Sequence, residues 1–148
     1  MARGRWVYDP DSGGITIPKR LRSTIESRVE TYAEEKFAGH YTRMAVRFRG
    51  KFCYIDAYTE PEPLPEGFSP ESWGETREEY MERMLKTPTH LCRLRYFGDI
   101  ERWSFAMYSY SNEKYRLAML PSTKDFFGTI EQCLQTAGGF YLLGEMAV

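Results

Sequence analysis

The sequence predicts an α+β domain, an antiparallel sheet of about five strands with helices packed on one face. Three observations lead to this fold class. Several segments alternate strictly between apolar and polar side chains, which is the pattern of a half-buried strand. Short turns separate most of these segments, so neighbouring strands run antiparallel. Two helical patterns lie near the ends of the chain, outside the run of strands.

The first predicted element is an amphipathic helix of about five turns that starts at Pro18. Proline is tolerated in the first turn of a helix because its missing N–H has no intrahelical acceptor there. The apolar residues of this segment recur every three or four positions, as one face of a helix requires. They are Ile17, Leu21, Ile25, Val29, Tyr32, Ala33 and Phe37. Gly39 ends the predicted helix.

Residues 42–58 form the clearest element, a hairpin of two alternating strands joined by Gly50 and Lys51. A glycine at the first position of a two-residue loop suits a type II′ turn, and that turn fixes the register of the strands. The predicted pairs are Arg49 with Phe52, Phe48 with Cys53, Arg47 with Tyr54, Val46 with Ile55, Ala45 with Asp56, Met44 with Ala57 and Arg43 with Tyr58. One face of the hairpin is therefore apolar and the other carries arginine and tyrosine.

Residues 60–86 form an acidic arm after the hairpin. Three closely spaced prolines exclude a helix or a central strand at its start, because proline donates no backbone hydrogen bond. Thr76 and Glu79 then form a capping box, which predicts a short helix. Pro88 ends that helix.

The second half of the chain predicts a meander of three strands. Residues 90–97 and 103–108 alternate on either side of a turn that begins at Gly98, so they form a second hairpin. The predicted pairs are Tyr96 with Trp103, Leu94 with Phe105 and Cys92 with Met107.

The last strand, residues 115–120, has two possible registers that differ in the length of the preceding loop. A three-residue loop turns Leu117 and Met119 toward the core. A four-residue loop turns Ala118 and Leu120 there instead, because a shift of one residue moves the whole strand to its other face.

A second amphipathic helix is predicted near the C-terminus. Thr129 and Gln132 form its capping box. One apolar stripe follows, made of Ile130, Cys133, Leu134, Ala137 and Tyr141. We expect Gly138 and Gly139 to weaken this helix or to end it early, because glycine is a poor helix former.

Length and composition indicate a single globular domain over residues 1–148. No apolar run approaches the ~18 to 20 residues of a membrane span, and the N-terminus lacks the apolar core of a signal peptide. We therefore expect a soluble, cytoplasmic protein without a membrane partner. Cys53, Cys92 and Cys133 are odd in number and fall on core positions, which favours buried reduced thiols over disulfides or a zinc site. Neither a metal nor another cofactor is expected.

One face of the predicted sheet collects arginine and tyrosine, because strand residues point alternately to opposite faces. The candidate ligand-binding residues on this face are Arg43, Arg47, Arg49, Tyr54, Asp56, Tyr58, Arg93 and Arg95. Guanidinium groups pair with phosphates and carboxylates, and aromatic rings stack on bases. We therefore expect a non-enzymatic domain that binds an anionic ligand here, either single-stranded nucleic acid or an acidic protein segment.

Three other interpretations of this face stay open. Arginine and tyrosine can simply solvate it through cross-strand stacking. Asp56 and Glu60 would share a face if their strand continued, which would suit a small metal-dependent enzyme acting on phosphates, although Asp56 also suits a cross-strand ion pair with Arg47. A structural homodimer that buries the tyrosines sheet to sheet is the third interpretation.

The charge of the chain is segregated along the sequence. Residues 1–51 carry eleven Lys and Arg against six Asp and Glu, whereas residues 60–86 carry eight Glu against three Lys and Arg. The acidic arm could therefore fold over the basic face, either as a lid or as an intramolecular counter-charge.

His90 and Cys92 are the one pairing of a histidine and a possible nucleophile that the pattern places on a common strand face. Their separation of about 7 Å along a strand exceeds hydrogen-bond reach. Cys92 also falls on a core position, so we interpret the pair as structural.

Four segments, spread over most of the chain, resemble an uncharacterised family of small bacterial proteins. They are GGITIP at 13–18, RFRGKFCYIDAYTEP at 47–61, TPTHLCRLRYFG at 87–98, and RWSF through YSNE at 102–113. The resemblance implies a bacterial, cytoplasmic source. It brings no activity and no catalytic residue with it.

Overall fold

The computed structural model describes residues 12–61 and 64–145. Its strands are β1 (Arg43–Arg49), β2 (Phe52–Tyr58), β3 (Thr89–Tyr96), β4 (Trp103–Ser109), β5 (Lys114–Leu117) and β6 (Phe127–Gly128). Its helices are the 3-10 turns η1 (Lys19–Leu21) and η2 (Pro70–Trp73) and the α-helices α2 (Arg22–Lys36), α3 (Arg77–Lys86) and α4 (Ile130–Tyr141).

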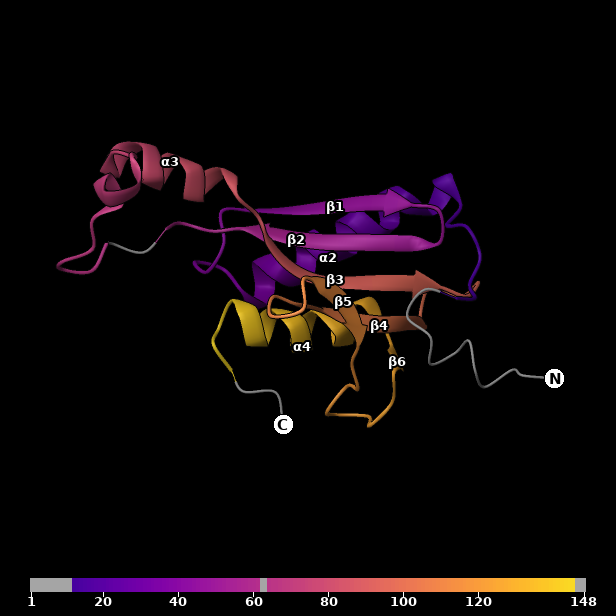
Figure 1. The fold of residues 1–148 in the computed structure, drawn as a ribbon. Helices are drawn as coiled ribbons and strands as arrows, with labels where there is room; N and C mark the ends of the chain where they lie inside the picture. The colour runs from indigo at the N-terminus through magenta and orange to yellow at the C-terminus, as the bar shows by residue number, and fades with distance from the viewer. Residues whose placement is uncertain (1–11, 62–63, 146–148) are drawn as a thin grey trace.

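The strands form one antiparallel sheet in which β1 to β5 lie side by side in chain order and β6 pairs with β4. Helices α2 and α4 pack on one face of this sheet and on each other (Figure 1). No described helix covers the other face, which we call the open face. The predicted α+β class, an antiparallel sheet with helices on one face, is confirmed.

Both predicted hairpin registers are confirmed. Every predicted β1–β2 pair is formed, and Gly50 has a φ of 59°, the left-handed backbone that the turn requires. The three predicted β3–β4 pairs are formed as well. Ser109 pairs with Lys114, so four residues make the loop before β5. The longer loop is therefore the one adopted, and it turns Leu120 into the core, where it is fully buried.

Strand β3 departs from regular alternation at Leu91. Ile55 pairs with Cys92 whereas the next residue of β2, Asp56, pairs with His90, so Leu91 is the extra residue of a β-bulge. Leu91 and Cys92 are both fully buried. The bulge turns His90 to the open face, and the predicted common face of His90 and Cys92 is therefore wrong.

The first helix follows its predicted stripe. α2 buries Ile25, Val29 and Ala33 against the sheet and α4. Phe37, directly after the helix, is 2% exposed.

α4 begins at the predicted capping box of Thr129 and Gln132, whose two hydrogen bonds are both formed. It then continues through Gly138 and Gly139 to Tyr141, so the prediction of an early end is wrong. A Cβ atom at Gly138 would lie 2.4 Å from a ring carbon of Phe37. Glycine is present there because it lets α4 approach the end of α2, and this packing outweighs the low helix propensity.

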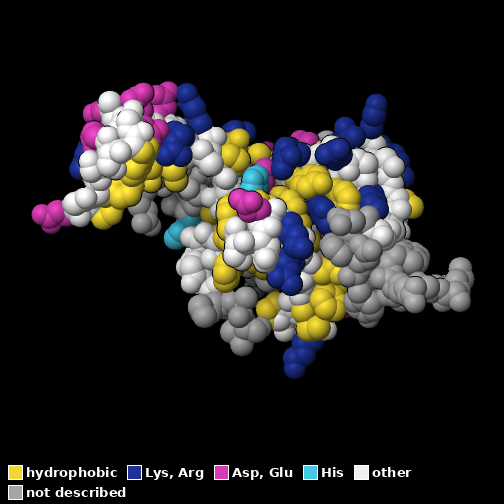
Figure 2. Space-filling view, in the orientation of Figure 1, with side chains coloured by type: hydrophobic (Ala, Val, Ile, Leu, Met, Phe, Trp, Pro, Cys, Tyr) yellow, Lys and Arg dark blue, Asp and Glu magenta, His cyan; other side chains and the backbone are white. Residues whose placement is uncertain are grey.

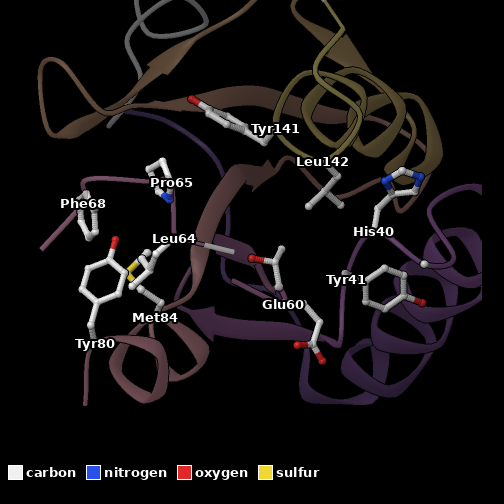
Figure 3. A pocket seen from close by; sticks show the side chains of 12 residues that line it. His40, Tyr41, Glu60, Leu64, Pro65, Phe68, Tyr80, Met84, Tyr141 and Leu142 are labelled. Carbon is white, nitrogen blue, oxygen red and sulfur yellow. The ribbon is translucent and has the colours of Figure 1, made fainter. Parts of the chain in front are cut away.

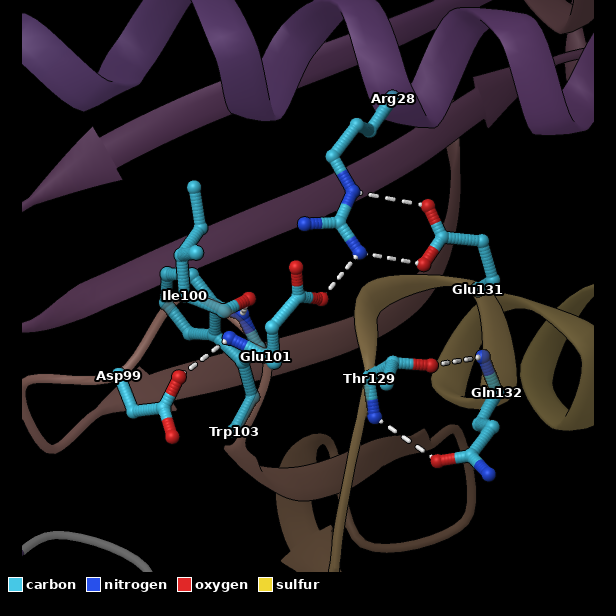
Figure 4. Close-up of polar contacts among 8 residues, drawn as sticks. All are labelled: Arg28, Asp99, Ile100, Glu101, Trp103, Thr129, Glu131 and Gln132. Atoms are coloured by element: carbon cyan, nitrogen blue, oxygen red, sulfur yellow. Dashed lines mark hydrogen bonds and ion pairs between the residues drawn. The ribbon is translucent and has the colours of Figure 1, made fainter.

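Arg28 of α2 ties the two helices to the turn between β3 and β4 (Figure 4). Its Nε and Nη2 atoms donate to both carboxylate oxygens of Glu131, at 2.9 and 2.6 Å. Nη2 also donates to Glu101 at 2.7 Å. The hydrogen bonds from Arg28 lower the pKa of Glu131. Bidentate pairing of an arginine with a carboxylate is among the strongest ion-pair geometries. Arg28 therefore fixes α4 against α2.

The core lies between the sheet and these two helices. Ile55, Leu94 and Phe105 are fully buried there, and Val46 of the edge strand β1 is partly buried against them. All three cysteines are buried and free, as predicted. Within residues 12–61 and 64–145, no helix combines the length and the apolar character that crossing a bilayer requires.

The acidic arm extends away from the sheet. Its helix α3 begins at the predicted capping box of Thr76 and Glu79 and lies beyond the ends of the strands (Figure 1). The rings of Phe68, Trp73 and Tyr80 pack on one another with centroids 5.3 to 6.3 Å apart. No residue of α3 is buried. The described part of the arm therefore does not cover the arginines of the open face, so the lid, one of the two possibilities considered for the arm, is not formed.

Candidate functional site

Arginine side chains of β1 lie on aromatic rings of β2 across the open face. The guanidinium of Arg43 stacks on Tyr58 at 4.1 Å from the ring centroid, and that of Arg47 stacks on Tyr54 at 4.9 Å. Such stacking holds a guanidinium in place over the ring.

A cationic hollow of about 550 Å³ opens on this face beside the β1–β2 turn. Arg49, Lys51 and Arg93 supply its charged side chains, and Phe52 and Tyr54 supply aromatic rings. None of the described residues that line it carries a carboxylate. Arg49 is exposed and forms no ion pair with a described acidic residue. The hollow thus concentrates positive charge beside aromatic surface.

The N-terminal segment forms the other wall of the cationic hollow. The backbone N–H of Ile15 donates to Tyr96 at 2.8 Å, and that of Ile17 donates to Gly50 at 2.9 Å. Gly14, directly before Ile15, has a φ of 93°. A Cβ atom at this position would lie 2.7 Å from the Tyr96 carbonyl oxygen. Glycine at this position therefore allows the segment to lie directly against β3.

The two arginines of β3 differ from those of β1 in exposure. Arg93 is 8% exposed and its guanidinium lies 4.1 Å from the Phe52 ring centroid and 5.3 Å from that of Tyr115. Arg95 is 2% exposed; it donates to the hydroxyl of Ser104 at 3.3 Å and to the carbonyl of Ser12. The expectation that Arg95 faces a ligand is wrong, because packing against the N-terminal segment buries it.

Asp56 is the buried acidic residue of the open face, at 3% exposure. Its Oδ2 atom accepts from Arg47, with Nη2 at 3.2 Å and Nε at 3.3 Å, which confirms the predicted cross-strand pair. Its Oδ1 atom lies 2.8 Å from Nδ1 of His90. Sequence reasoning missed His90 because regular alternation puts it on the core face, and only the bulge at Leu91 reverses this.

Three tyrosines surround His90 on the same face. The Tyr108 ring lies 4.9 Å from the imidazole centroid, that of Tyr110 lies 6.4 Å away and nearly parallel, and that of Tyr115 lies 6.5 Å away. The Tyr115 hydroxyl is buried and has no hydrogen-bond partner among the described residues. Burial, with a smaller contribution from the Asp56 carboxylate, raises the pKa of Tyr115. This hydroxyl therefore stays protonated at neutral pH.

Glu60 does not join Asp56. β2 ends at Tyr58, and Glu60 lies in a second cavity of about 600 Å³ between the arm and the sheet (Figure 3). Leu64, Pro65, Phe68, Tyr80 and Met84 form the arm side of this cavity; His40, Tyr41, Tyr141 and Leu142 form the other side. In the described parts of the chain, no cluster of three or more His, Cys, Asp or Glu side chains could hold a metal ion.

The space-filling view shows how charge is divided over the molecule (Figure 2). On the face seen there, several Lys and Arg side chains lie over the sheet, and the largest group of Asp and Glu side chains lies at the end that carries α3, together with some Lys and Arg. The comparisons of this chain with protein-family models, curated proteins and solved structures find no match. The function is therefore inferred from the geometry of the open face.

Proposed function

We propose that the open face binds single-stranded nucleic acid, with phosphate groups in the cationic hollow. The observation that carries this proposal is the lining of the hollow: three cations, two aromatic rings and no carboxylate among the described residues. Arg49 provides exposed charge, Lys51 is half-buried beside it, and Arg93 adds charge from the floor.

The aromatic rings favour nucleic acid over an acidic protein segment. A phosphate and a carboxylate would pair with these cations in the same way. Phe52 and Tyr54, however, offer surface on which a base can stack, and each stacked base contributes about 1 to 3 kcal/mol to binding. A peptide of Asp and Glu gains nothing comparable from the rings.

Of the three other interpretations, the metal-dependent enzyme and the structural homodimer have less support from the structure. A metal-dependent enzyme would need Asp56 and Glu60 at one site, and they lie at different ones. A two-fold dimer through the open face would bury the exposed charges of Arg43, Arg47 and Arg49, which costs desolvation free energy.

Fluorescence anisotropy tests the proposal with labelled single-stranded oligonucleotides over a range of salt concentrations. Arg49→Gln and Lys51→Gln should each weaken binding about fivefold, as expected for the loss of ~1 kcal/mol per exposed contact. Each should also reduce the slope of log K against log salt by about 0.7. Lys36→Gln is the control, since it removes the same charge from the exposed end of α2.

Two outcomes would count against nucleic acid as the ligand. If wild-type protein bound no oligonucleotide at 20 mM salt, the proposal would be rejected. If it bound a poly-glutamate peptide more tightly than an oligonucleotide, an acidic protein segment would replace nucleic acid as the ligand.

A further inference from the structure

The pairing of His90 with Asp56 fixes the proton positions on the imidazole. The Asp56 carboxylate is buried and accepts from Arg47 through one oxygen, and its other oxygen lies 2.8 Å from Nδ1 of His90. A carboxylate only accepts hydrogen bonds, so Nδ1 carries the proton. The neutral imidazole therefore has its lone pair on Nε2, as a general base requires.

Nε2 of His90 is available to a ligand. The side chain is 33% exposed, and no described residue forms a hydrogen bond with Nε2. The rings of Tyr108 and Tyr110 hold the imidazole from its sides. The imidazole is thus oriented by its neighbours while its basic nitrogen stays unoccupied.

The backbone around His90 is built for this orientation. The bulge at Leu91 takes the His90 N–H out of the regular ladder, and that N–H donates instead to the Tyr110 hydroxyl at 2.8 Å. β-Bulges are frequent beside functional sites because they re-aim a side chain. Here the bulge directs a histidine toward the face that holds the cationic hollow.

The histidine and the cationic hollow form one continuous surface. Asp56 follows Tyr54 by two residues on β2, a distance of about 7 Å along a strand. Arg47 contacts both of these residues, and its side chain is 56% exposed. The Tyr115 ring contacts Tyr54 as well as His90. A strand of nucleic acid with one phosphate in the hollow would therefore extend over His90.

We propose that His90, held by Asp56, is the general base of a metal-independent cleavage of single-stranded RNA; this inference rests on the proposed binding function. His90 Nε2 takes the proton of a ribose 2′-hydroxyl, and the 2′ oxygen forms a bond to the adjacent phosphorus. The bond from phosphorus to the 5′ oxygen breaks with its electron pair. A water molecule protonates that oxygen, and the resulting hydroxide recovers the proton from the imidazolium. The products are a 2′,3′-cyclic phosphate and a free 5′-hydroxyl.

Other groups of the open face have positions that suit this reaction. The Arg47 guanidinium lies beside Asp56 and offers positive charge to the phosphorane. Asp56 is a positioning residue, because it acts through His90. Since the nucleophile is the 2′-hydroxyl, DNA of the same sequence is bound and left intact.

The test uses a 5′-fluorescent single-stranded RNA, the matching DNA and the matching 2′-O-methyl RNA, all with EDTA. We expect cleavage of RNA alone, with mass spectrometry showing the cyclic phosphate end. His90→Gln should lower the rate about a hundredfold or more, the usual contribution of a general base. Its affinity for 2′-O-methyl RNA should equal that of wild type, which shows that the open face is intact.

The possible failures are distinct from one another. Lys36→Gln should cleave RNA at the wild-type rate. Binding of 2′-O-methyl RNA without cleavage of RNA would overturn the catalytic inference and leave the binding proposal in place. No binding would overturn both, and equal cleavage by His90→Gln would remove His90 from the reaction.

Discussion

Two neighbouring glycines of α4 should respond in opposite ways to the same substitution. A Cβ at Gly138 would lie 2.4, 2.5 and 3.1 Å from three ring carbons of Phe37, closer than packed carbon atoms approach. Phe37 is 2% exposed, so its ring has no space to move into. A Cβ at Gly139 would meet instead the carboxylate end of Glu145, an exposed and flexible side chain.

The expected magnitudes follow from two opposing effects. Replacing glycine by alanine inside a helix stabilises it by up to ~1 kcal/mol. Overpacking a core costs about 1 to 3 kcal/mol. Gly138→Ala should therefore destabilise the domain by about 1 to 2 kcal/mol, because the clash with Phe37 exceeds the gain in propensity. Gly139→Ala should stabilise it by about 0.5 kcal/mol, because the Glu145 side chain can move aside.

Urea unfolding followed by circular dichroism measures both changes, and thermal midpoints should shift by about 2 to 4 °C per kcal/mol. Phe37→Leu provides the matched background, since it removes ring atoms that clash with the new methyl group. In that background the cost of Gly138→Ala should shrink by at least 1 kcal/mol. Equal stabilisation by both alanines would refute the close approach of α4 to the end of α2.

Three further predictions concern charge and reactivity. Arg28 lowers the pKa of Glu131 below its ordinary value of 4.5. The stability that Glu131 contributes is therefore full above that pH and is lost as the pH falls through the folded-state pKa. Glu131→Gln should cost ~1 kcal/mol at pH 7 and progressively less below pH ~4, as measured by pH-dependent unfolding. Glu60→Gln and Glu66→Gln should leave oligonucleotide affinity unchanged at 0.15 M salt by anisotropy, since the arm extends away from the sheet and the screening length is about 8 Å. A severalfold gain in affinity would instead indicate that the arm covers the open face. Burial raises the pKa of all three thiols, so a colorimetric thiol reagent should label none in native protein and all three in denaturant, and rapid native labelling would contradict the assigned core.

The hairpins could be predicted from the sequence because side-chain alternation and turn chemistry are local. Gly50 with Lys51 set one register, and the turn that begins at Gly98, with the apolar alternation of residues 103–107, set the other. Only the last strand stayed ambiguous, since loop length is weakly encoded and one residue reverses the face. The structure resolves it in favour of the four-residue loop.

The errors at the candidate site have non-local causes. A β-bulge gives no sequence signal in single-residue alternation, so His90 was assigned to the wrong face. The alternation of its strand predicts that Arg95 is exposed, but the N-terminal segment packs over it. Its low helix propensity predicts that Gly138 ends the helix, but its close approach to Phe37 explains why glycine is present inside α4. Each error arises where a second segment of the chain decides the outcome.

The central claim is that the cationic hollow of the open face binds single-stranded nucleic acid. The most direct measurement is a titration of ¹⁵N-labelled protein with 2′-O-methyl RNA, followed by amide chemical shifts. We expect saturable shifts at the amides of Lys51, Phe52, Tyr54 and Arg93, with those of α2 and α3 unchanged. Shifts confined to the arm or to the helical face, or no shifts at low salt, would contradict it.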